Sequence, residues 1–267
     1  MKKYNISEAA RILNLSQGLL RHYEELGFID PVRDPNGYRS FQVKDIDILI
    51  GIRRFRNMGF SLKEIEGIFD SGAPEGIGVM MEEKIRELEK ELLWKKLLLK
   101  SMKETCRELR RIDRALGRFR IVRSPEALRI QNRINDRYLM ENLSPESLRW
   151  VRCLPVVSIS PEFPLEAVRE GREEVGFGFM IPYRLAEPLN LARTPRTRYY
   201  PPRTCVTTVV FSQGRERISA RHLREALAFL EGSGHTADGD PWGITLGHSR
   251  REGVDRRFHR VYLPIKE

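Results

Sequence analysis

The strongest constraint on the fold of this chain is a heptad repeat of apolar residues between residues 79 and 117. When Ile85 is taken as an a position, nine of the eleven a and d positions over five heptads are apolar. The a positions are Ile85, Leu92, Leu99, Cys106 and Asp113, and the d positions are Met81, Leu88, Lys95, Met102, Leu109 and Leu116. A seam of this length is typical of a coiled coil. The repeat predicts a long dimerising helix, although a long helix packed within one chain remains an alternative.

Two short helical segments joined by a tight turn stand at the start of the chain. Ser7 is placed to cap a helix over residues 8–15, and Ser16 is placed to cap a second helix that Gly27 ends. Serine satisfies free N–H groups in a first helical turn, and glycine commonly ends a helix. Two helices joined in this way form a helix-turn-helix, whose second helix commonly enters the major groove of DNA.

The segment after this helix pair predicts a hairpin. Residues 34–37, Asp-Pro-Asn-Gly, are a strong turn signal between two short extended segments, and Asn-Gly suits the positive φ of a tight turn. A hairpin directly after a helix-turn-helix is a wing, which would present Arg33, Tyr38 and Arg39 to DNA phosphates. The same turn chemistry also fits an ordinary surface hairpin.

A second helix pair follows the hairpin. Residues 43–57 are predicted to form a helix that Gly59 ends, and Ser61 with Glu64 predicts a capping box at the start of the next helix. Residues 70–78, DSGAPEGIG, are rich in glycine and predict a linker before the heptad repeat.

Beyond residue 121 the chain changes to short apolar runs separated by proline and glycine. Strands are predicted over 154–160, 176–183, 203–211, 242–248 and 259–265, and helices over 161–173 and 217–234. Short strands mixed with a few helices predict an α+β domain with an antiparallel sheet. The chain is therefore predicted to be a multidomain α+β protein. Its expected domains are a winged helix-turn-helix at 1–75, a coiled-coil helix at 76–120 and an α+β domain at 121–267.

Charge gives weak support to a DNA partner. The formal net charge is +10, but residues 1–78 hold 11 basic and 11 acidic side chains, so the predicted DNA-binding segment is neutral. The three cysteines are far apart and form neither a CxxC pair nor a disulfide framework, which favours a reducing cytoplasm. No stretch approaches the roughly 18 apolar residues of a membrane span, and no secretory signal is visible. We therefore expect a cytoplasmic protein with no membrane partner.

Residues 4–70 resemble the MerR family of transcription regulators. The resemblance rests on LRHYEELGFI, on GYRSF in the hairpin and on MGFSLKEI before the fourth helix. It implies a homodimer that binds double-stranded promoter DNA and distorts it, so that the promoter elements align for RNA polymerase. The positions that match the family's DNA contacts are Ser16, Gln17, Arg21, Tyr23, Tyr38, Arg39, Ser61 and Lys63. Ser40 and Phe41 depart from the family's usual basic residue and tyrosine in the wing, and we expect modestly altered backbone contacts.

Residues 150–267 resemble the gyrase-inhibitor-like effector domain of multidrug-sensing members of that family. The shared features are YYPP, the strand–helix unit 203–230 and the final strand ending in LPIK. The resemblance implies a small organic effector. Family members often carry a glutamate on the last strand that faces cationic drugs, whereas Arg260 stands there in this chain, which favours an anionic or neutral effector. The candidate effector-binding residues are Phe177, Phe179, Tyr183, Tyr200, Trp242 and Arg260.

Two other interpretations of the last domain stay open. It could be a small-molecule hydrolase using Glu173 and Glu174, but no nucleophile–base pair is visible, so we do not expect an enzyme. It could also be a ligand-free module that binds protein partners. Metal-sensing relatives carry cysteines near the end of the dimerisation helix, whereas none lies here between Cys106 and Cys153. Cys106 is expected to be a small buried hydrophobe, and no metal or cofactor is expected.

Overall fold

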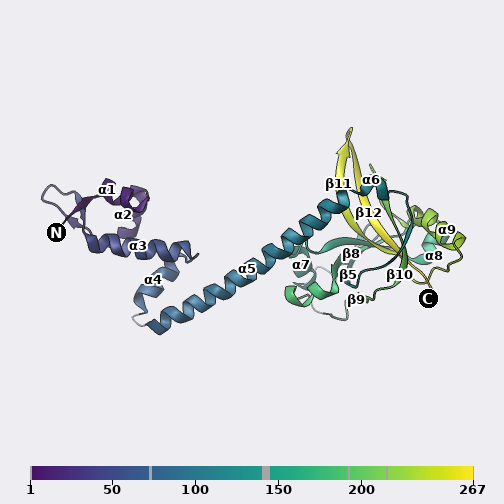
Figure 1. Ribbon diagram of the computed structural model, residues 1–267, viewed down its shortest axis with the longest axis horizontal. Coiled ribbons are helices and arrows are strands. Elements are labelled where there is room, and N and C mark those ends of the chain that lie inside the picture. The colour runs from purple at the N-terminus through teal and green to yellow at the C-terminus, as the bar shows by residue number, and fades with distance from the viewer. Residues whose placement is uncertain (1, 72–73, 140–144, 192, 215, 267) are drawn as a thin grey trace. The chain divides into compact units, whose positions relative to one another are not determined.

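The computed structural model describes residues 2–71, 74–139, 145–191, 193–214 and 216–266. The chain forms two compact units, residues 1–93 and residues 94–267. Helix α5 (Pro74–Leu109) contributes its first part to one unit and its last part to the other (Figure 1). Among the described residues, no helix combines the length and the apolar character that a membrane span requires.

The first unit is built from four short helices, a small antiparallel sheet and the start of α5. The helices are α1 (Ile6–Leu13), α2 (Gln17–Glu25), α3 (Val43–Asn57) and α4 (Leu62–Asp70), and the strands are β1 (Tyr4–Asn5), β2 (Val32–Arg33) and β3 (Arg39–Phe41), in the order β1-β3-β2. The four helices share one buried core that includes Leu20, Phe41, Leu49, Phe60 and Ile65. The predicted succession of helix, turn, helix, hairpin and helix pair is confirmed.

The helix starts follow cap chemistry, with one correction. Helix α1 begins one residue before the predicted cap Ser7, because Asn5 and Glu8 form a capping box with hydrogen bonds of 2.9 and 2.8 Å. Ser16 caps α2 as predicted by accepting a hydrogen bond from the Leu19 N–H at 3.1 Å. The predicted capping box of Ser61 and Glu64 at the start of α4 is also present.

The hairpin turn forms, but with a different geometry from the expected tight Asn-Gly turn. Pro35 fixes its own φ at a negative value, which suits the second position of a type I turn, so the turn is centred on Pro35 and Asn36 and not on Asn36 and Gly37. Gly37 alone adopts a positive φ, +80°, and its N–H donates to the Asp34 carbonyl at 2.7 Å. This arrangement fits a longer hairpin loop that ends in a left-handed glycine.

Helix α5 differs from its predicted bounds at both ends. It begins at Pro74, inside the segment 70–78 that predicted a linker, because proline is well suited to a first helical turn. Gly72 and Ala73 of that segment lie outside the described residues. The helix ends at Leu109, and the short helix α6 (Ile112–Ala115) follows. Ile112 is buried against the second unit, with Val209 and Leu246.

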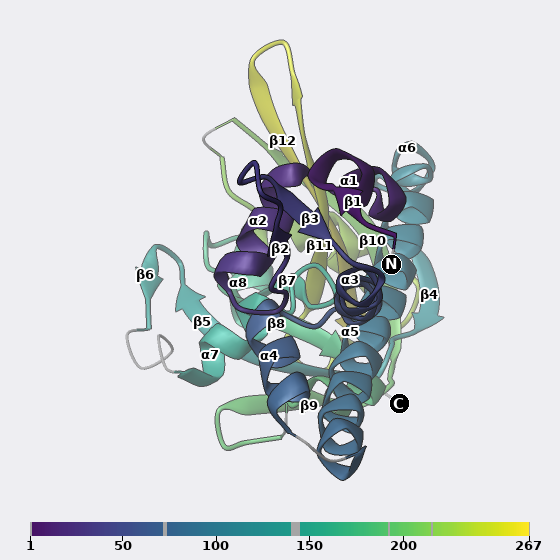
Figure 2. The ribbon, with the colours of Figure 1, turned by 90° about the vertical axis from the view of Figure 1, so that its left-hand side faces the viewer.

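The second unit is organised around one large antiparallel sheet. Its strands are β4 (Arg120–Arg123), β5 (Ala127–Ile134), β6 (Arg137–Tyr138), β7 (Ser158–Glu162), β8 (Gly176–Pro182), β9 (Thr197–Tyr200), β10 (Thr204–Gln213), β11 (Trp242–Arg251) and β12 (Val254–Pro264). The order is β4-β10-β12-β11-β7-β8-β5-β6, with β9 also paired to β5. The β11–β12 hairpin extends beyond the neighbouring strands (Figure 2). The predicted antiparallel α+β domain is confirmed as a sheet-rich domain.

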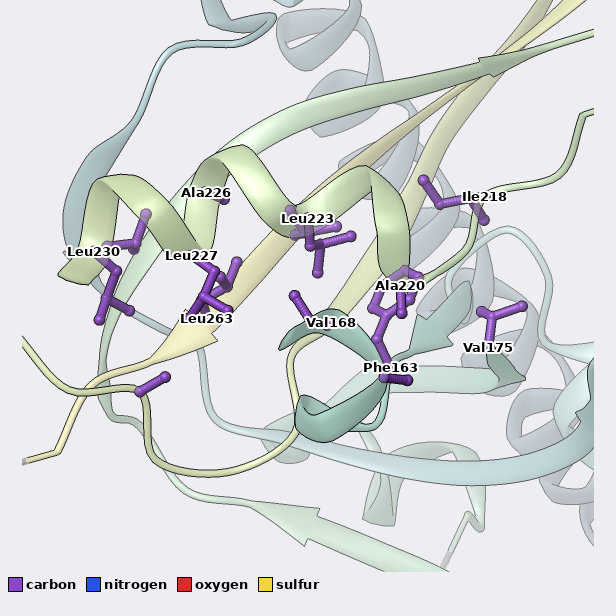
Figure 3. Close-up of a cluster of buried hydrophobic side chains, with 14 of the residues drawn as sticks. Phe163, Val168, Val175, Ile218, Ala220, Leu223, Ala226, Leu227, Leu230 and Leu263 are labelled. Atoms are coloured by element: carbon purple, nitrogen blue, oxygen red, sulfur yellow. The ribbon is translucent and has the colours of Figure 1, made fainter. Parts of the chain in front are cut away.

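Helices α7 (Pro145–Arg152), α8 (Leu165–Glu170) and α9 (Arg224–Gly232) cover one face of this sheet, and the last part of α5 lies on the other face. Helix α8 and helix α9, with the turn before α9, pack over β10 and β12. Figure 3 shows Leu223, Leu227 and Leu230 gathered with Leu263 of β12. Helix α7 packs Trp150 against Leu128 and Ile130 of β5.

The predicted strands match strands of the structure except at 154–160, although β12 begins at Val254 and not at residue 259. Within 154–160 only Ser158 onward is extended, because residues 153–156 continue from α7 as turns. Helix α7 and strands β4, β5, β6 and β9 were not predicted. Residues 127–130 of β5 are buried, and the strand carries Arg129, Gln131 and Arg133 where an apolar run would be expected.

Candidate functional site

Helix α2 presents the first group of candidate DNA-binding residues. The Arg21 side chain is exposed on this helix. Gln17 donates a hydrogen bond to the Ser7 hydroxyl at 3.1 Å and so joins the first turns of α1 and α2. Ser16 holds the helix start through its cap. Gln17 and Ser16 thus fix the helix pair, and Arg21 is a cation of α2 that is free to reach a phosphate or a base edge.

Tyr23 is a core residue, which corrects its assignment as a DNA contact. Its side chain is 4% exposed, and its ring meets Phe28 edge to face with centroids 6.1 Å apart. The sequence correctly predicted that Tyr23 lies on α2. Its ring, however, faces the core of the first unit. Its ring is therefore not available to DNA in this conformation.

The wing carries one exposed aromatic residue and two arginines that share an acidic partner. Tyr38 is 76% exposed. Arg39 Nε lies 2.5 Å from Glu24 of α2, and Arg33 lies 3.5 Å from the same carboxylate. Glu24 therefore joins the hairpin to α2 and holds Arg39 in place. A phosphate would compete with Glu24 for these two guanidinium groups.

The start of α4 brings Ser61 and Lys63 to the surface. Ser61 caps the helix, and hydrogen bonds from Ser61 and then from Lys84 lower the pKa of Glu64 to about 2. Lys84 belongs to α5, and its Nζ lies 3.0 Å from Glu64. Lys63 is exposed in the first turn of α4, and so it stays free to meet an anion.

A cavity in the second unit lies between the last part of α5 and the sheet. We call it the α5 cavity; it is lined by Leu97, Ser101, Thr105 and Glu108 of α5 and by Met180, Trp242, Ile244 and Tyr262 of the sheet, among others. Its volume is about 180 Å³. Apolar side chains with a few polar groups are typical of small-molecule sites. Trp242 stacks on Tyr262 with ring centroids 4.6 Å apart, which gives the cavity a flat aromatic wall.

Arg260 is not a free cation beside this cavity, which corrects the reason for expecting an anionic effector there. Its guanidinium lies 2.6 Å from Glu108 of α5. The two side chains are 24% and 29% exposed, so the pair is only partly solvated. The charge of Arg260 is thus largely neutralised. The pair also fastens α5 to β12.

A buried ion pair lies beside the aromatic wall, and sequence analysis missed it. Arg129 is 2% exposed, and its guanidinium lies 2.7 Å from Glu162. Glu162 also accepts hydrogen bonds from Arg198 at 2.9 Å and from the Tyr200 hydroxyl. Burial and then the negative charge of Glu162 raise the pKa of Tyr200, so this phenol stays protonated and donates. Tyr200 is thereby a structural partner of Glu162, packed edge to face against Trp242.

The predicted effector residues do not meet at one place. Trp242 lines the α5 cavity. Phe177 and Phe179 line a second cavity; they alternate along β8 with Met180, so they point to the opposite face of the sheet. Tyr183 contacts Tyr199 at 5.1 Å between ring centroids and lines neither cavity. The alternation of side chains along each strand was recognisable in the sequence. Which face of the sheet a given side chain occupies was not.

The remaining candidates take part in surface ion pairs or stand alone. Glu173 pairs with Arg221 at 2.6 Å, and Glu174 pairs with Arg172. Cys106 is exposed in the single chain, whereas burial raises the pKa of Cys205. Within the described part of the chain, no three His, Cys, Asp or Glu side chains gather as a metal site would require.

Comparison with known proteins shows which proteins the first unit resembles. Residues 4–72 match the family model described as MerR HTH family regulatory protein. A "Probable heavy metal-dependent transcriptional regulator" of Haemophilus influenzae is 48% identical over 62 residues, 23% of this chain and 48% of that protein. The regulator HmrR of Sinorhizobium medicae is 34% identical over 94 residues, 33% of this chain and 64% of that protein. The matches thus span about half to two thirds of these relatives. They identify residues 4–72 as a MerR-type helix-turn-helix domain.

The similar solved structures differ in how much of this chain they cover. A MerR family transcriptional regulator from Bacillus cereus is 25% identical over 41% of this chain and 84% of its own, with a TM-score of 0.37. The EcmrR–DNA complex is 14% identical over 99% of this chain and 100% of its own, with a TM-score of 0.39. A hydrolase from Listeria innocua is 12% identical over 60% of this chain and 97% of its own, with a TM-score of 0.39.

Proposed function

We propose that this chain, which carries a MerR-type helix-turn-helix domain, is a ligand-responsive transcription regulator that binds and distorts promoter DNA as a homodimer. In this proposal residues 1–75 read DNA, 76–120 form the dimerisation helix and 121–267 sense a small organic effector. The observation that carries it is the α5 cavity. The last part of α5 forms one wall of this cavity, and the first part of the same helix packs on the DNA-binding domain.

The DNA-binding part of the proposal rests on exposed polar and charged side chains of the first unit. Arg21 on α2, Tyr38 on the hairpin and Lys63 on α4 are all exposed. Arg39 is 30% exposed at its side chain and held by Glu24. These groups suit contacts to phosphates, which position a protein on DNA, with Arg21 also suited to a base edge.

The homodimer part rests on the unpartnered heptad seam of α5. Leu92, Leu99 and Met102 are 54%, 53% and 58% exposed in the single chain. A helix that leaves such residues in water gains stability when a second copy covers them, roughly 1.5–3 kcal/mol for each fully buried side chain. The opposite side of α5 already packs on its own sheet through Leu97 and Ser101. A second copy is therefore the occupant that fits the remaining face.

The proposal that residues 121–267 sense an effector rests on the volume of the α5 cavity and on the helix that forms part of its wall. Small-molecule sites commonly measure about 300–1,000 Å³, whereas this cavity measures about 180 Å³. A drug-sized ligand therefore fits only when part of the wall moves. Because α5 forms that wall, a ligand that binds one position of α5 better than another shifts the dimer between two DNA-binding states. In this proposal RNA polymerase responds to the resulting change in promoter shape.

Arg39→Ala is expected to weaken DNA binding and to lower its salt dependence. The substitution removes one phosphate contact, so the slope of log affinity against log salt concentration should become shallower by about 1. The measurement is fluorescence anisotropy of a labelled duplex at several salt concentrations. Arg169→Ala, a loss of an exposed arginine on α8, is the matched control. An unchanged slope would remove the hairpin from the proposed interface.

Thr105→Phe is expected to block the α5 cavity from the helix side. The neutral apolar dye N-phenyl-1-naphthylamine should bind the full chain with enhanced fluorescence, and Thr105→Phe should bind it at least about tenfold more weakly, a difference of about 1.4 kcal/mol. Thr105→Val, which keeps the side-chain volume, is the control. Dye binding should also change the anisotropy titration with DNA in the unmodified chain. If the dye binds in the cavity and DNA binding does not respond, the effector role fails.

A further inference from the structure

The sheet of the second unit has another cavity on the face opposite to the α5 cavity. It measures about 370 Å³, within the range of small-molecule sites. We call it the arginine cavity, because Arg133 and Arg257 line it together with the aromatic rings of Phe177 and Phe179. Its residues come from β5, β6, β7, β8, β10, β11 and β12 and from the segment before α9.

The lining of the arginine cavity is cationic. It includes Arg133, Arg257 and His248, and none of its described lining residues is Asp or Glu. Arg217 also lines it but is paired with Asp136. Within the described part of the chain, neither Arg133 nor Arg257 forms an ion pair. The Arg133 guanidinium instead stacks over the Phe177 ring, 4.2 Å from its centroid. Asp255 lies outside this lining and pairs with Arg250, although the charge of Arg257 also helps to lower the pKa of Asp255. Guanidinium groups without an ion pair favour a negatively charged occupant.

Two deeply buried side chains in the same lining each have a polar atom without a hydrogen-bond partner among the described residues. His259 is 2% exposed, and its Nε2 has no hydrogen-bond partner among the described residues. Its Nδ1 lies 3.1 Å from the Thr245 hydroxyl. Burial, and then the charges of His248, His222 and Arg257, lower the pKa of His259 to about 3, so the ring is neutral at pH 7. When the Thr245 hydroxyl donates to Nδ1, the ring proton lies on Nε2 and can be donated to a ligand.

Ser212 provides a second such group. Its side chain is 1% exposed, and its hydroxyl likewise has no partner within the described residues. Buried polar groups in proteins are nearly always hydrogen-bonded. Among the residues that the structure describes, the same cavity thus holds two donors that lack a hydrogen-bond partner and two guanidinium groups that lack an ion pair. This combination is expected of a site that binds a negatively charged acceptor group.

We propose that the arginine cavity binds a small organic anion, a carboxylate attached to a flat apolar ring. Its carboxylate would accept hydrogen bonds from Arg257 and from the buried donors, and its ring would lie against Phe177, Phe179 and Ile218. This site is distinct from the α5 cavity, since it lies on the other face of the sheet. It does not depend on the regulator function proposed above.

The test is isothermal titration calorimetry of the full chain with benzoate, 2-naphthoate and the neutral 2-naphthamide. We expect saturable binding of a carboxylate at one site per chain, and binding of the amide at least about tenfold weaker. Arg257→Gln should weaken carboxylate binding by about tenfold or more. Arg256→Gln, on the adjacent residue of β12 that faces the other side of the sheet, should change it less than about twofold. Circular dichroism confirms that each variant is folded.

Three results would overturn the proposal. One is the absence of saturable binding by both carboxylates, and another is equal affinity for 2-naphthoate and 2-naphthamide. The third is a folded Arg257→Gln protein that retains full affinity. If Arg257→Gln does not fold, the comparison of carboxylate with amide in the unmodified chain decides. Thr105→Phe should leave 2-naphthoate binding unchanged, which separates this site from the α5 cavity and from the proposed function.

Discussion

Replacing both Leu92 and Leu99 with aspartate is expected to convert the protein into a monomer and to lower its affinity for an inverted-repeat duplex by at least about 100-fold. Both leucines occupy a positions and are more than half exposed in the single chain. Two aspartates would place a carboxylate where the second copy is proposed to pack, and burial of an unpaired charge is strongly unfavourable. Loss of the second DNA-binding head removes the avidity of a two-headed protein, commonly a factor of about 10²–10⁴.

The mass in solution, from sedimentation velocity, and a mobility-shift titration check this expectation together. Lys90→Asp is the control, because Lys90 is an exposed residue of α5 that lies off the heptad seam. It should leave both the mass and the affinity nearly unchanged. Neither leucine belongs to the core of the first unit, so the DNA-binding domain should stay folded. A double variant that remains dimeric would show that the seam of α5 is not the interface.

Arg129→Met is expected to destabilise the second unit by about 3–5 kcal/mol, because it leaves the carboxylate of Glu162 buried without its main partner. Arg129 also donates to the Ser160 and Gly176 carbonyls at 3.3 Å, and these hydrogen bonds are lost as well. The readout is urea unfolding followed by tryptophan fluorescence. The three tryptophans, Trp94, Trp150 and Trp242, all lie in residues 94–267, so the signal reports on this unit alone.

The exposed pair of Arg169 and Glu166 supplies the matched control for this substitution. Its atoms lie 2.6 Å apart, but the two side chains are 41% and 64% exposed. Surface pairs of this kind contribute about 0–1 kcal/mol, so Arg169→Met should have little effect. If Arg129→Met costs no more than Arg169→Met, the buried pair does not stabilise the sheet in the way proposed.

Local chemistry explains which parts of the fold could be predicted from the sequence. Ser16, Ser61 and Glu64 act through backbone groups within three residues, so their roles are visible without the tertiary structure. The heptad repeat likewise predicted one continuous helix. Its start at Pro74 follows from the suitability of proline for a first helical turn. Its end at Leu109 is followed by the packing of Ile112, which was not visible in the pattern.

The candidate sites were harder to predict, because they depend on which side of an element meets which neighbour. Strand β5 was missed because Arg129 interrupts its apolar run, and the buried partner of that arginine, Glu162, is 33 residues away. Arg260 was expected to face an effector, but Glu108, 152 residues away, neutralises it. The wall that α5 gives to its cavity includes the polar residues Ser101 and Thr105, and nothing in the sequence indicated that they line a cavity.

Selection of bound DNA from a random-sequence duplex pool by the full chain tests the proposed function most directly. Two MerR-type heads joined by α5 predict enrichment of an inverted repeat, because a symmetric dimer reads two half-sites related by a dyad. The Leu92→Asp, Leu99→Asp double variant should enrich no such repeat. If the unmodified chain enriched no sequence, or only a single half-site with no dyad, the proposal of a dimeric promoter-binding regulator would be contradicted.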